Sequence, residues 1–363
     1  LDARLAHRLA VDDRHGLPPL RRAVEDAVHL LAAALGQVAA ARVRLEHLAH
    51  LDEAARTATA AALAAQAAGL DFIAVTDHNT TSQAEALTEL QPSFPDLLLM
   101  TGREVTTFQG HANVFGPTAF IDFRLGSPSV PAIGDLQRAV AAAGGVFSIN
   151  HPALPSGEPC MGCGWTAKDT DFSAVQAIEV ANGGGARVGG GFEGALSGVP
   201  FWEAQLNQGR RITAIGGSDN HDAGLPHGQL SAVGRPTTVI HARGLSAEAL
   251  IEGLRAGRVF VDLDGTRDRM LDLAAETDQH RAVMGGTLTA KPGQTVTFAA
   301  TVSGVDPFDI EVIQDGARIT PPIVAGRFEI RMGQRRQWVR VNVRAPDSRL
   351  LLVGNPIYLD PGS

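Results

Sequence analysis

The feature that most constrains the fold of this chain is an alternation of short apolar segments with alanine-rich helical segments between residues 43 and 267. Short apolar runs bounded by turn residues are typical of buried strands. Strands that alternate with helices favour a mostly parallel sheet, and seven or eight such strands favour a closed α/β barrel. The expected strands are 43–46, 71–75, 97–100, 112–115, 146–149, 177–180, 212–215 and 237–240, and the expected helices are 52–68, 133–143, 201–208 and 247–256.

The pattern changes at both ends of this region. Residues 1–42 are rich in Ala, Leu and Arg, and we expect them to form a helical segment with a docking or capping role. Residues 268–363 contain segments of alternating apolar and polar residues, separated by Gly and Pro. This alternation predicts a small antiparallel C-terminal β-sandwich domain. Its expected strands are 295–302, 308–313, 328–332 and 338–343.

The charge and hydropathy of the chain argue against two classes of partner. The net charge is −8 and no run of basic residues is present, so we expect no nucleic-acid groove. The apolar runs are too short for a membrane span, and the first residues lack the pattern of a signal peptide. We therefore expect a soluble cytoplasmic protein that acts on a small molecule, with its oligomeric state left open.

The two cysteines, Cys160 and Cys163, have the spacing Cys-x-x-Cys. A structural zinc site needs four ligands, which usually come from two such pairs, so this pair cannot complete one without nearby histidines. Three interpretations stay open from sequence: a plain feature of a loop, a local disulfide, or a role in redox or metal chemistry.

Histidines and carboxylates recur beside the expected strands. Most of them directly follow a strand, and one leads into the next strand. The carboxyl ends of barrel strands meet on one face, where active sites are built, so we expect these side chains to share one pocket. They are His78, Glu104, His111, His151, Asp219 and His221.

These residue types fit a metal centre. Imidazole nitrogens and carboxylate oxygens suit zinc, manganese or iron. A lone histidine at a strand end is more often a hydrogen-bonded residue than a ligand, but burying this many polar groups without a cation would cost several kcal/mol. The set predicts two or three divalent ions, bridged by a carboxylate such as Glu104. Such ions lower the pKa of bound water from about 15.7 towards 7 and so supply hydroxide. The expected catalytic residues are Glu104, Asp219 and His221.

The segments that carry these residues resemble the polymerase-and-histidinol-phosphatase (PHP) superfamily. The run from Asp71 to Thr81 is close to the second motif of that superfamily. Within it, the chain looks most like the carbaryl-hydrolase-like (CehA/McbA) metallohydrolases, on segments 110–114, 160–165, 180–183, 216–221, 257–261 and 355–358. The resemblance implies a distorted TIM-like (β/α)7 barrel with a polynuclear metal centre, and it supports the six ligands above.

The first motif of the superfamily is altered here. In the superfamily this motif is His-x-His, followed shortly by His-Ser-Asp-Gly. An alignment without gaps places His47 of this chain at the second histidine and Asp52 at the aspartate. Leu45 then occupies the position of the first histidine. Side chains at i and i+2 of a strand share a face, so this change removes half of a two-histidine clamp. Either binding of the first metal is weakened, or another side chain such as Glu46 or His50 takes the place of the missing histidine. The resemblance adds His47 and Asp52 to the expected metal ligands.

Three functions compete. The first is hydrolysis of an ester or carbamate of a small organic molecule by a metal-activated hydroxide. The second is phosphoester hydrolysis, which favours Arg or Lys near the metals. Arg103 is the candidate cation, but neighbours on a strand point to opposite faces, so we expect it to face away from Glu104. The third is a degenerate metal-binding module without activity.

Overall fold

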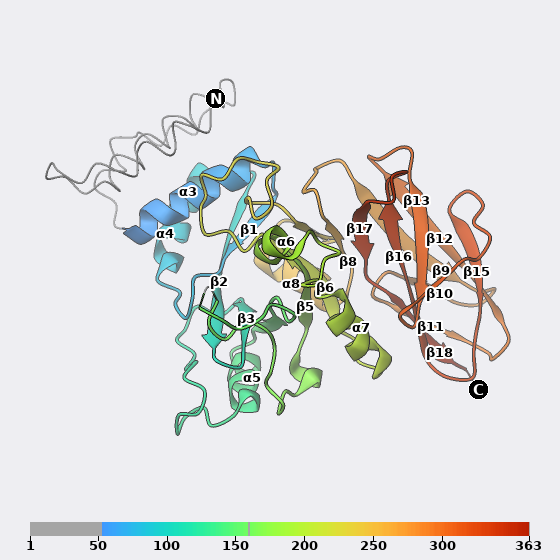
Figure 1. Ribbon diagram of the computed structural model, residues 1–363, viewed down its shortest axis with the longest axis horizontal. Helices are drawn as coiled ribbons and strands as arrows, with labels where there is room; N and C mark the ends of the chain where they lie inside the picture. Colours follow the sequence, from blue (N-terminus) through green and yellow to red (C-terminus); the bar gives the residue numbers. More distant parts are fainter. Residues whose placement is uncertain (1–52, 159, 363) are drawn as a thin grey trace, which may run out of the picture. The chain divides into compact units, whose positions relative to one another are not determined.

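The computed structural model describes residues 53–158 and 160–362 (Figure 1). The unit described below begins at Glu53. The predicted helical segment 1–42 and the predicted strand 43–46 lie outside the described residues.

A six-stranded sheet forms the first half of the described chain. Its order follows the sequence from β1 to β6. The pairs β1–β2, β4–β5 and β5–β6 are parallel, whereas β2–β3 and β3–β4 are antiparallel. The strands are β1 (Phe72–Val75), β2 (Leu98–Thr107), β3 (Gly110–Phe115), β4 (Val146–Ile149), β5 (Ala177–Asn182) and β6 (Thr213–Gly217).

Helices cover this sheet and separate most of its strands. In α3, Ala58, Ala62 and Ala65 are buried at helical spacing and join one apolar cluster with residues of α4, β1 and β2. Trp202 of α7 packs in the main core with Ile149 and Ile178. The helices are α3 (Glu53–Ala67), α4 (Gln83–Leu90), α5 (Ile133–Ala142), α6 (Gly183–Gly189), α7 (Val199–Asn207) and α8 (Ala247–Arg255), with 3-10 turns η1 (Gln91–Ser93) and η2 (Phe172–Ala174).

The sheet differs from the closed barrel that the sequence predicts. It is an open path from β1 to β6, and β7 (Thr237–Ile240), which was expected in the barrel, pairs with β8 (Val259–Asp262) in another sheet. β8 in turn pairs with β17 (Leu350–Gly354). A sheet closed into a ring is therefore not seen among the described residues, because β8 pairs with β17 of the C-terminal region and β7 pairs with β8.

The C-terminal strands form two sheets that face one another (Figure 1). One has the order β10-β9-β12-β15 and the other β11-β18-β16-β17-β8-β7. A shared apolar core, including Phe298 and Val341, lies between them. The sandwich is not wholly antiparallel, since β11 and β18 run parallel. Its remaining strands are β9 (Met270–Glu276), β10 (Arg281–Val283), β11 (Thr287–Ala290), β12 (Thr295–Ser303), β13 (Asp309–Gln314), β14 (Ala317–Ile319), β15 (Arg327–Arg331), β16 (Gln337–Arg344) and β18 (Ile357–Pro361).

The described region is thus a mixed α/β fold with a curled sheet and a two-layered β region. The boundary between residues 267 and 268 stays a prediction. Within the described residues, none of the helices has the length and apolar character needed to cross a membrane.

Candidate metal centre

Glu104 lies at the middle of the candidate site, and it comes from the interior of a strand. The sequence placed it just past a strand at residues 97–100, but β2 continues to Thr107. β2 is extended because its last residues pair with β3, with Thr106 opposite His111 and Thr107 opposite Gly110. Val105, Thr106 and Thr107 are β-branched residues, which favour extended backbone.

The β2–β3 hairpin places three polar side chains on one face. Glu104 and Thr106 are two residues apart, so they point to the same side, and His111 is directly opposite Thr106. The segment after β1 runs alongside, because the backbone N–H of Glu104 donates to Asp77 at 3.1 Å and that of Asn79 donates to Glu104 at 2.9 Å. This pairing brings His78 next to Glu104.

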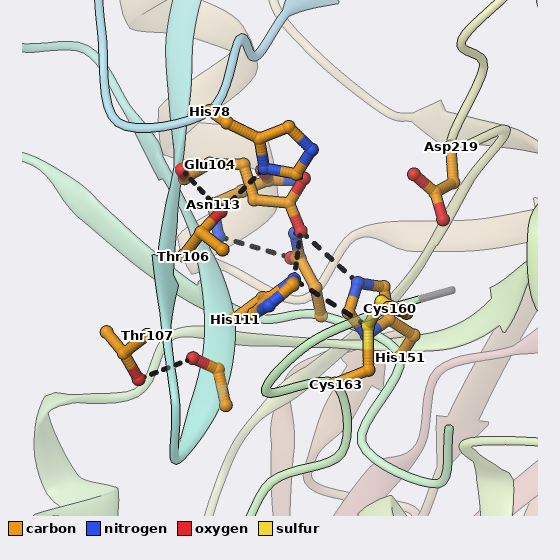
Figure 2. Close-up of polar contacts among 12 residues, drawn as sticks. His78, Glu104, Thr106, Thr107, His111, Asn113, His151, Cys160, Cys163 and Asp219 are labelled. Atoms are coloured by element: carbon orange, nitrogen blue, oxygen red, sulfur yellow. Dashed lines mark hydrogen bonds and ion pairs between the residues drawn. A yellow bond between two sulfur atoms is a disulfide. The ribbon is translucent and has the colours of Figure 1, made fainter. Parts of the chain in front are cut away.

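One carboxylate oxygen of Glu104 lies close to several side-chain nitrogen atoms (Figure 2). Oε1 lies 3.2 Å from Nδ1 of His111 and 3.2 Å from Nε2 of His151. The amide of Asn150 donates to the same oxygen at 3.0 Å. All four side chains are buried. Glu104, His111 and His151 offer ligand atoms that lie within 4.8 Å of one another, so they form a group that could hold a metal ion.

His78 and His221 lie at the exposed side of this group. Their side chains are 48% and 68% exposed. His78 Nδ1 is 2.6 Å from the hydroxyl of Thr106 and 3.4 Å from Oε2 of Glu104. The ring centroid of His78 is 5.8 Å from that of His221 and 6.1 Å from that of His111. The histidines therefore form a series from the buried His151 to the open side of the site.

Asp219 joins the site through residues to which the sequence analysis gave no role. Asn182, at the end of β5, donates to Asp219 at 3.2 Å and to the buried Glu179 at 3.0 Å. Glu179 also accepts the backbone N–H of His151 at 2.9 Å. The signal for Glu179 was present, since it is a carboxylate within an otherwise apolar expected strand. Asn150 directly follows an expected strand and Asn182 lies in the segment 180–183, but an asparagine at these positions does not by itself indicate a supporting role.

The buried groups shift one another's pKa. Burial works to raise the pKa of Glu104, but hydrogen bonds from His111 and His151 outweigh it and hold the pKa far below its usual value. Burial works to lower the pKa of His151, whereas the hydrogen bond to Glu104 and the charges of Glu179 and Asp219 raise it to about 9. Burial raises the pKa of Glu179 to about 7. In the metal-free protein, a proton on His151 thus supplies positive charge at this site.

The hydrogen bonds of Glu104, His111 and His151 are compatible with a cation bound between these side chains. Nε2 of His111 faces the carbonyl of Met161 at 3.0 Å, and a carbonyl only accepts, so this nitrogen carries the hydrogen. The hydrogen bond from Nδ1 to Glu104 described above therefore needs a His111 that is protonated at both nitrogens, whereas a neutral His111 presents a lone pair at Nδ1 to the carboxylate. Two acceptors at 3.2 Å need a proton or a cation between them. Nδ1 of His151 is also buried without a hydrogen-bond partner among the described residues.

The structure thus brings together six of the eight predicted ligands. His78, Glu104, His111, His151, Asp219 and His221 are connected by the contacts above, although only Glu104, His111 and His151 form the tight group. His47 and Asp52 lie outside the described residues. The roles of all eight as ligands, and of Glu104, Asp219 and His221 in catalysis, stay predictions.

Arg103 faces away from Glu104, as the strand alternation predicts. It is buried, and its guanidinium donates to the carbonyls of Pro117 at 3.0 Å and Ala119 at 2.6 Å. Its pKa is lowered by burial. Because these carbonyls occupy the guanidinium, Arg103 does not supply a cation to the candidate site.

The Cys160–Cys163 pair forms a disulfide in a loop beside His111 (Figure 2). Among the sequence interpretations, the local disulfide is the state that the structure contains. Cys163 is buried, and its Sγ lies 3.8 Å from Nδ1 of His111.

Comparisons with known proteins assign no family. No family model and no curated protein matches the chain. Among solved structures, a protein from Bifidobacterium adolescentis described as a metal-dependent phosphoesterase is 16% identical, with a TM-score of 0.34 over 47% of this chain and 84% of that chain. A likeness at this TM-score carries no argument about function, so membership of the PHP superfamily and the carbaryl-hydrolase-like group stays a prediction.

Proposed function

We propose that this protein is a metal-dependent hydrolase that cleaves an ester bond of a small molecule. The observation that carries the proposal is the buried Glu104 carboxylate, whose Oε1 lies 3.2 Å from each of two histidine rings. This donor set needs a cation, and a hydrolase is the class of enzyme in which such a cation acts on water and on the substrate oxygen.

The residues that would hold metal are those of the tight group, with His78 as a further ligand towards the open side. A bound divalent ion would lower the pKa of water and stabilise negative charge that develops on the substrate. Asn150 holds the Glu104 carboxylate by donating to Oε1, and the Met161 carbonyl fixes the tautomer of His111. Asn182 keeps Asp219 oriented.

The open side of the centre provides the groups for proton transfer. His221 is exposed, and its Nδ1 lies 3.7 Å from the nearer carboxylate oxygen of Asp219. A histidine beside a carboxylate can accept a proton from water or donate one to a leaving group near neutral pH. We therefore assign proton transfer to this pair and the orientation of the substrate to the buried group.

The proposed substrate is a carboxylic or carbamic ester. Recognition of a phosphate favours an arginine or lysine that converges on it. Arg103 is occupied by two backbone carbonyls, so this side chain is not available to a phosphate. Phosphoester hydrolysis is the competing activity, and one experiment separates the two.

The test compares an aryl ester, an aryl carbamate and an aryl phosphate that share one chromogenic leaving group. The full chain is stripped with a chelator and then supplied with zinc, manganese or iron. We expect metal-dependent release from the ester or carbamate, loss of release in Glu104→Gln, and normal release in the control Glu329→Gln, which changes an exposed carboxylate of β15. Release from the phosphate alone would overturn the substrate assignment. No release from any substrate with any of the metals would support the degenerate module instead.

A further inference from the structure

His111 belongs to two overlapping groups of potential metal ligands. One is the group with Glu104 and His151, and the other consists of His111, Cys160 and Cys163. In each group the ligand atoms lie within 4.8 Å of one another. The second group plays no part in the proposed hydrolysis, and its sulfur ligands give it a different metal preference.

The cysteine loop is held firmly against the β2–β3 hairpin. Gly162 has a φ of +81°, and a Cβ atom there would lie 1.9 Å from the carbonyl oxygen of Thr107. The ring of Trp165 covers Gly110 at the start of β3, where a Cβ atom would lie 2.4 Å from it. The backbone N–H of Thr166 donates to Gln109 at 2.7 Å. These contacts fix the cysteines next to His111.

One ring nitrogen of His111 lies close to both the Glu104 carboxylate and the Cys163 sulfur. Nε2 is engaged by the carbonyl of Met161, which lies within the cysteine loop itself. The other ring nitrogen, Nδ1, lies 3.2 Å from Glu104 Oε1 and 3.8 Å from Cys163 Sγ. A histidine whose other nitrogen donates to a backbone carbonyl is oriented as metal-binding histidines usually are.

We propose that Cys160, Cys163 and His111 form a second metal site that opens when the disulfide is reduced. Two thiolates and one imidazole suit a soft or borderline ion such as Zn²⁺, with the fourth position left to water or another group. The disulfide lacks thiolates, so the oxidised loop leaves His111 to Glu104 and His151. The thiol state of the loop therefore decides which ligand group His111 can join.

The redox step balances with a cellular thiol as the reductant. Two thiols donate two electrons and two protons to the Cys160–Cys163 bond, which yields two cysteine thiols and one new disulfide in the reductant. Each cysteine then releases its proton when it binds the ion.

The test uses Cd²⁺ alone as the probe, because thiolate coordination of Cd²⁺ produces an ultraviolet charge-transfer absorption. The full chain is reduced with a phosphine, freed of reductant under inert gas, and titrated beside the oxidised protein. We expect an absorption that saturates near one equivalent in the reduced protein and is absent from the oxidised protein. Cys160→Ser/Cys163→Ser should abolish it, and the exposed-histidine control His280→Ala should retain it.

His111 is tested by the affinity for Cd²⁺ rather than by the absorption alone. His111→Ala should weaken binding by more than the roughly 100-fold that loss of an outer-sphere partner costs at most. His111→Gln serves if the alanine variant does not fold. An unchanged affinity in the folded variant, or no thiolate absorption in the reduced wild type, would overturn the site. Hydrolase activity is not the readout, so failure here and failure of the proposed function are distinguishable.

Discussion

Two buried polar clusters in this molecule differ in how the negative charge of their carboxylates is neutralised. In the first, Arg340 of β16 is buried and donates to Glu203 at 2.6 and 3.0 Å and to Asn342 at 2.6 Å. Asn342 donates in turn to Glu311, which also receives Arg344 at 2.9 Å. Each carboxylate of this cluster has a guanidinium from the chain itself.

The second cluster is centred on Glu104. Among the described residues, no arginine or lysine contacts the carboxylate of Glu104. Its positive charge in the metal-free state is a proton on His151, whose pKa is raised to about 9 by its acidic neighbours despite burial. Unpaired buried charge is costly, so natural proteins pair it or place a metal beside it. The comparison indicates that the Arg340 cluster serves structure and that the Glu104 cluster is arranged for an exchangeable cation.

The largest effect is expected where the Glu104 cluster loses its charge. Glu104→Gln keeps the size of the side chain and its acceptor for Asn150, but removes the carboxylate that faces both histidines. We expect activity to fall by more than the roughly 100-fold that loss of an outer-sphere partner costs, with the fold retained. Turnover of the preferred aryl substrate measures the activity, and circular dichroism measures whether the fold is retained. Wild-type turnover in the variant would contradict a central role for Glu104.

Loss of the built-in cation should instead affect stability. Arg340→Met leaves Glu203 and Asn342 without their donor, and breaking one side of a buried pair costs about 3 kcal/mol in the free energy of unfolding. Denaturant unfolding measures the loss. The double variant Arg340→Met/Glu203→Gln removes both charges and should recover part of it. A loss as large in the double variant as in the single one would show that packing, rather than charge, is responsible.

A smaller effect on function is expected at Asn182. Its Oδ1 accepts the N–H of Gly185 at the start of α6, while its amide donates to Glu179 and Asp219. Asn182→Ser keeps a capping oxygen and removes the amide. We expect a roughly 10- to 100-fold fall in metal affinity or activity, typical of the loss of an outer-sphere partner. Metal titration checks this, and an affinity equal to that of the wild type would remove Asn182 from the site.

The smallest effect concerns acid sensitivity in the Arg340 cluster. Burial works to raise the pKa of Glu311, but hydrogen bonds from Asn342 and Arg344 outweigh it and hold the pKa below its usual value of 4.5. A lowered pKa contributes stability above the unfolded value, and that contribution is lost as the pH falls through the folded value. Glu311→Gln should therefore be less stable than wild type at neutral pH, with a difference that shrinks below pH 4.5. A difference that does not change with pH would contradict this.

The sequence predicted the positions of individual strands better than the pairing between them. Apolar runs located β4 and β7 at their observed ends, because burial imposes the pattern locally. The alternation along β2 also placed Arg103 and Glu104 on opposite faces. The length of β2 was wrong, since it depends on pairing with β3. The closed barrel is not shown among the described residues, because β8 pairs with the distant β17 and carries β7 with it into another sheet.

The contacts that the supporting residues make could not be predicted from the sequence for the same reason. Met161 contacts His111 from 50 residues away, and Glu179 contacts His151 from 28 residues away. Neither spacing forms a local motif, so only the packed structure brings these groups together. The candidate ligands were visible because their residue types recur beside strands, whereas a backbone carbonyl leaves no mark in a sequence.

The most direct test of the central claim is a metal titration of chelator-stripped full chain in a Cys160→Ser/Cys163→Ser background, which removes the thiol ligands. Zn²⁺ or Mn²⁺ is added to this protein and to its Glu104→Gln variant, and binding is followed by calorimetry and thermal unfolding. The protein that retains Glu104 should bind metal and gain about 2.7 kcal/mol in stability at a free metal concentration about 100 times the Kd. The Glu104→Gln variant should gain far less. Equal binding by both, or no binding by either, would contradict the account.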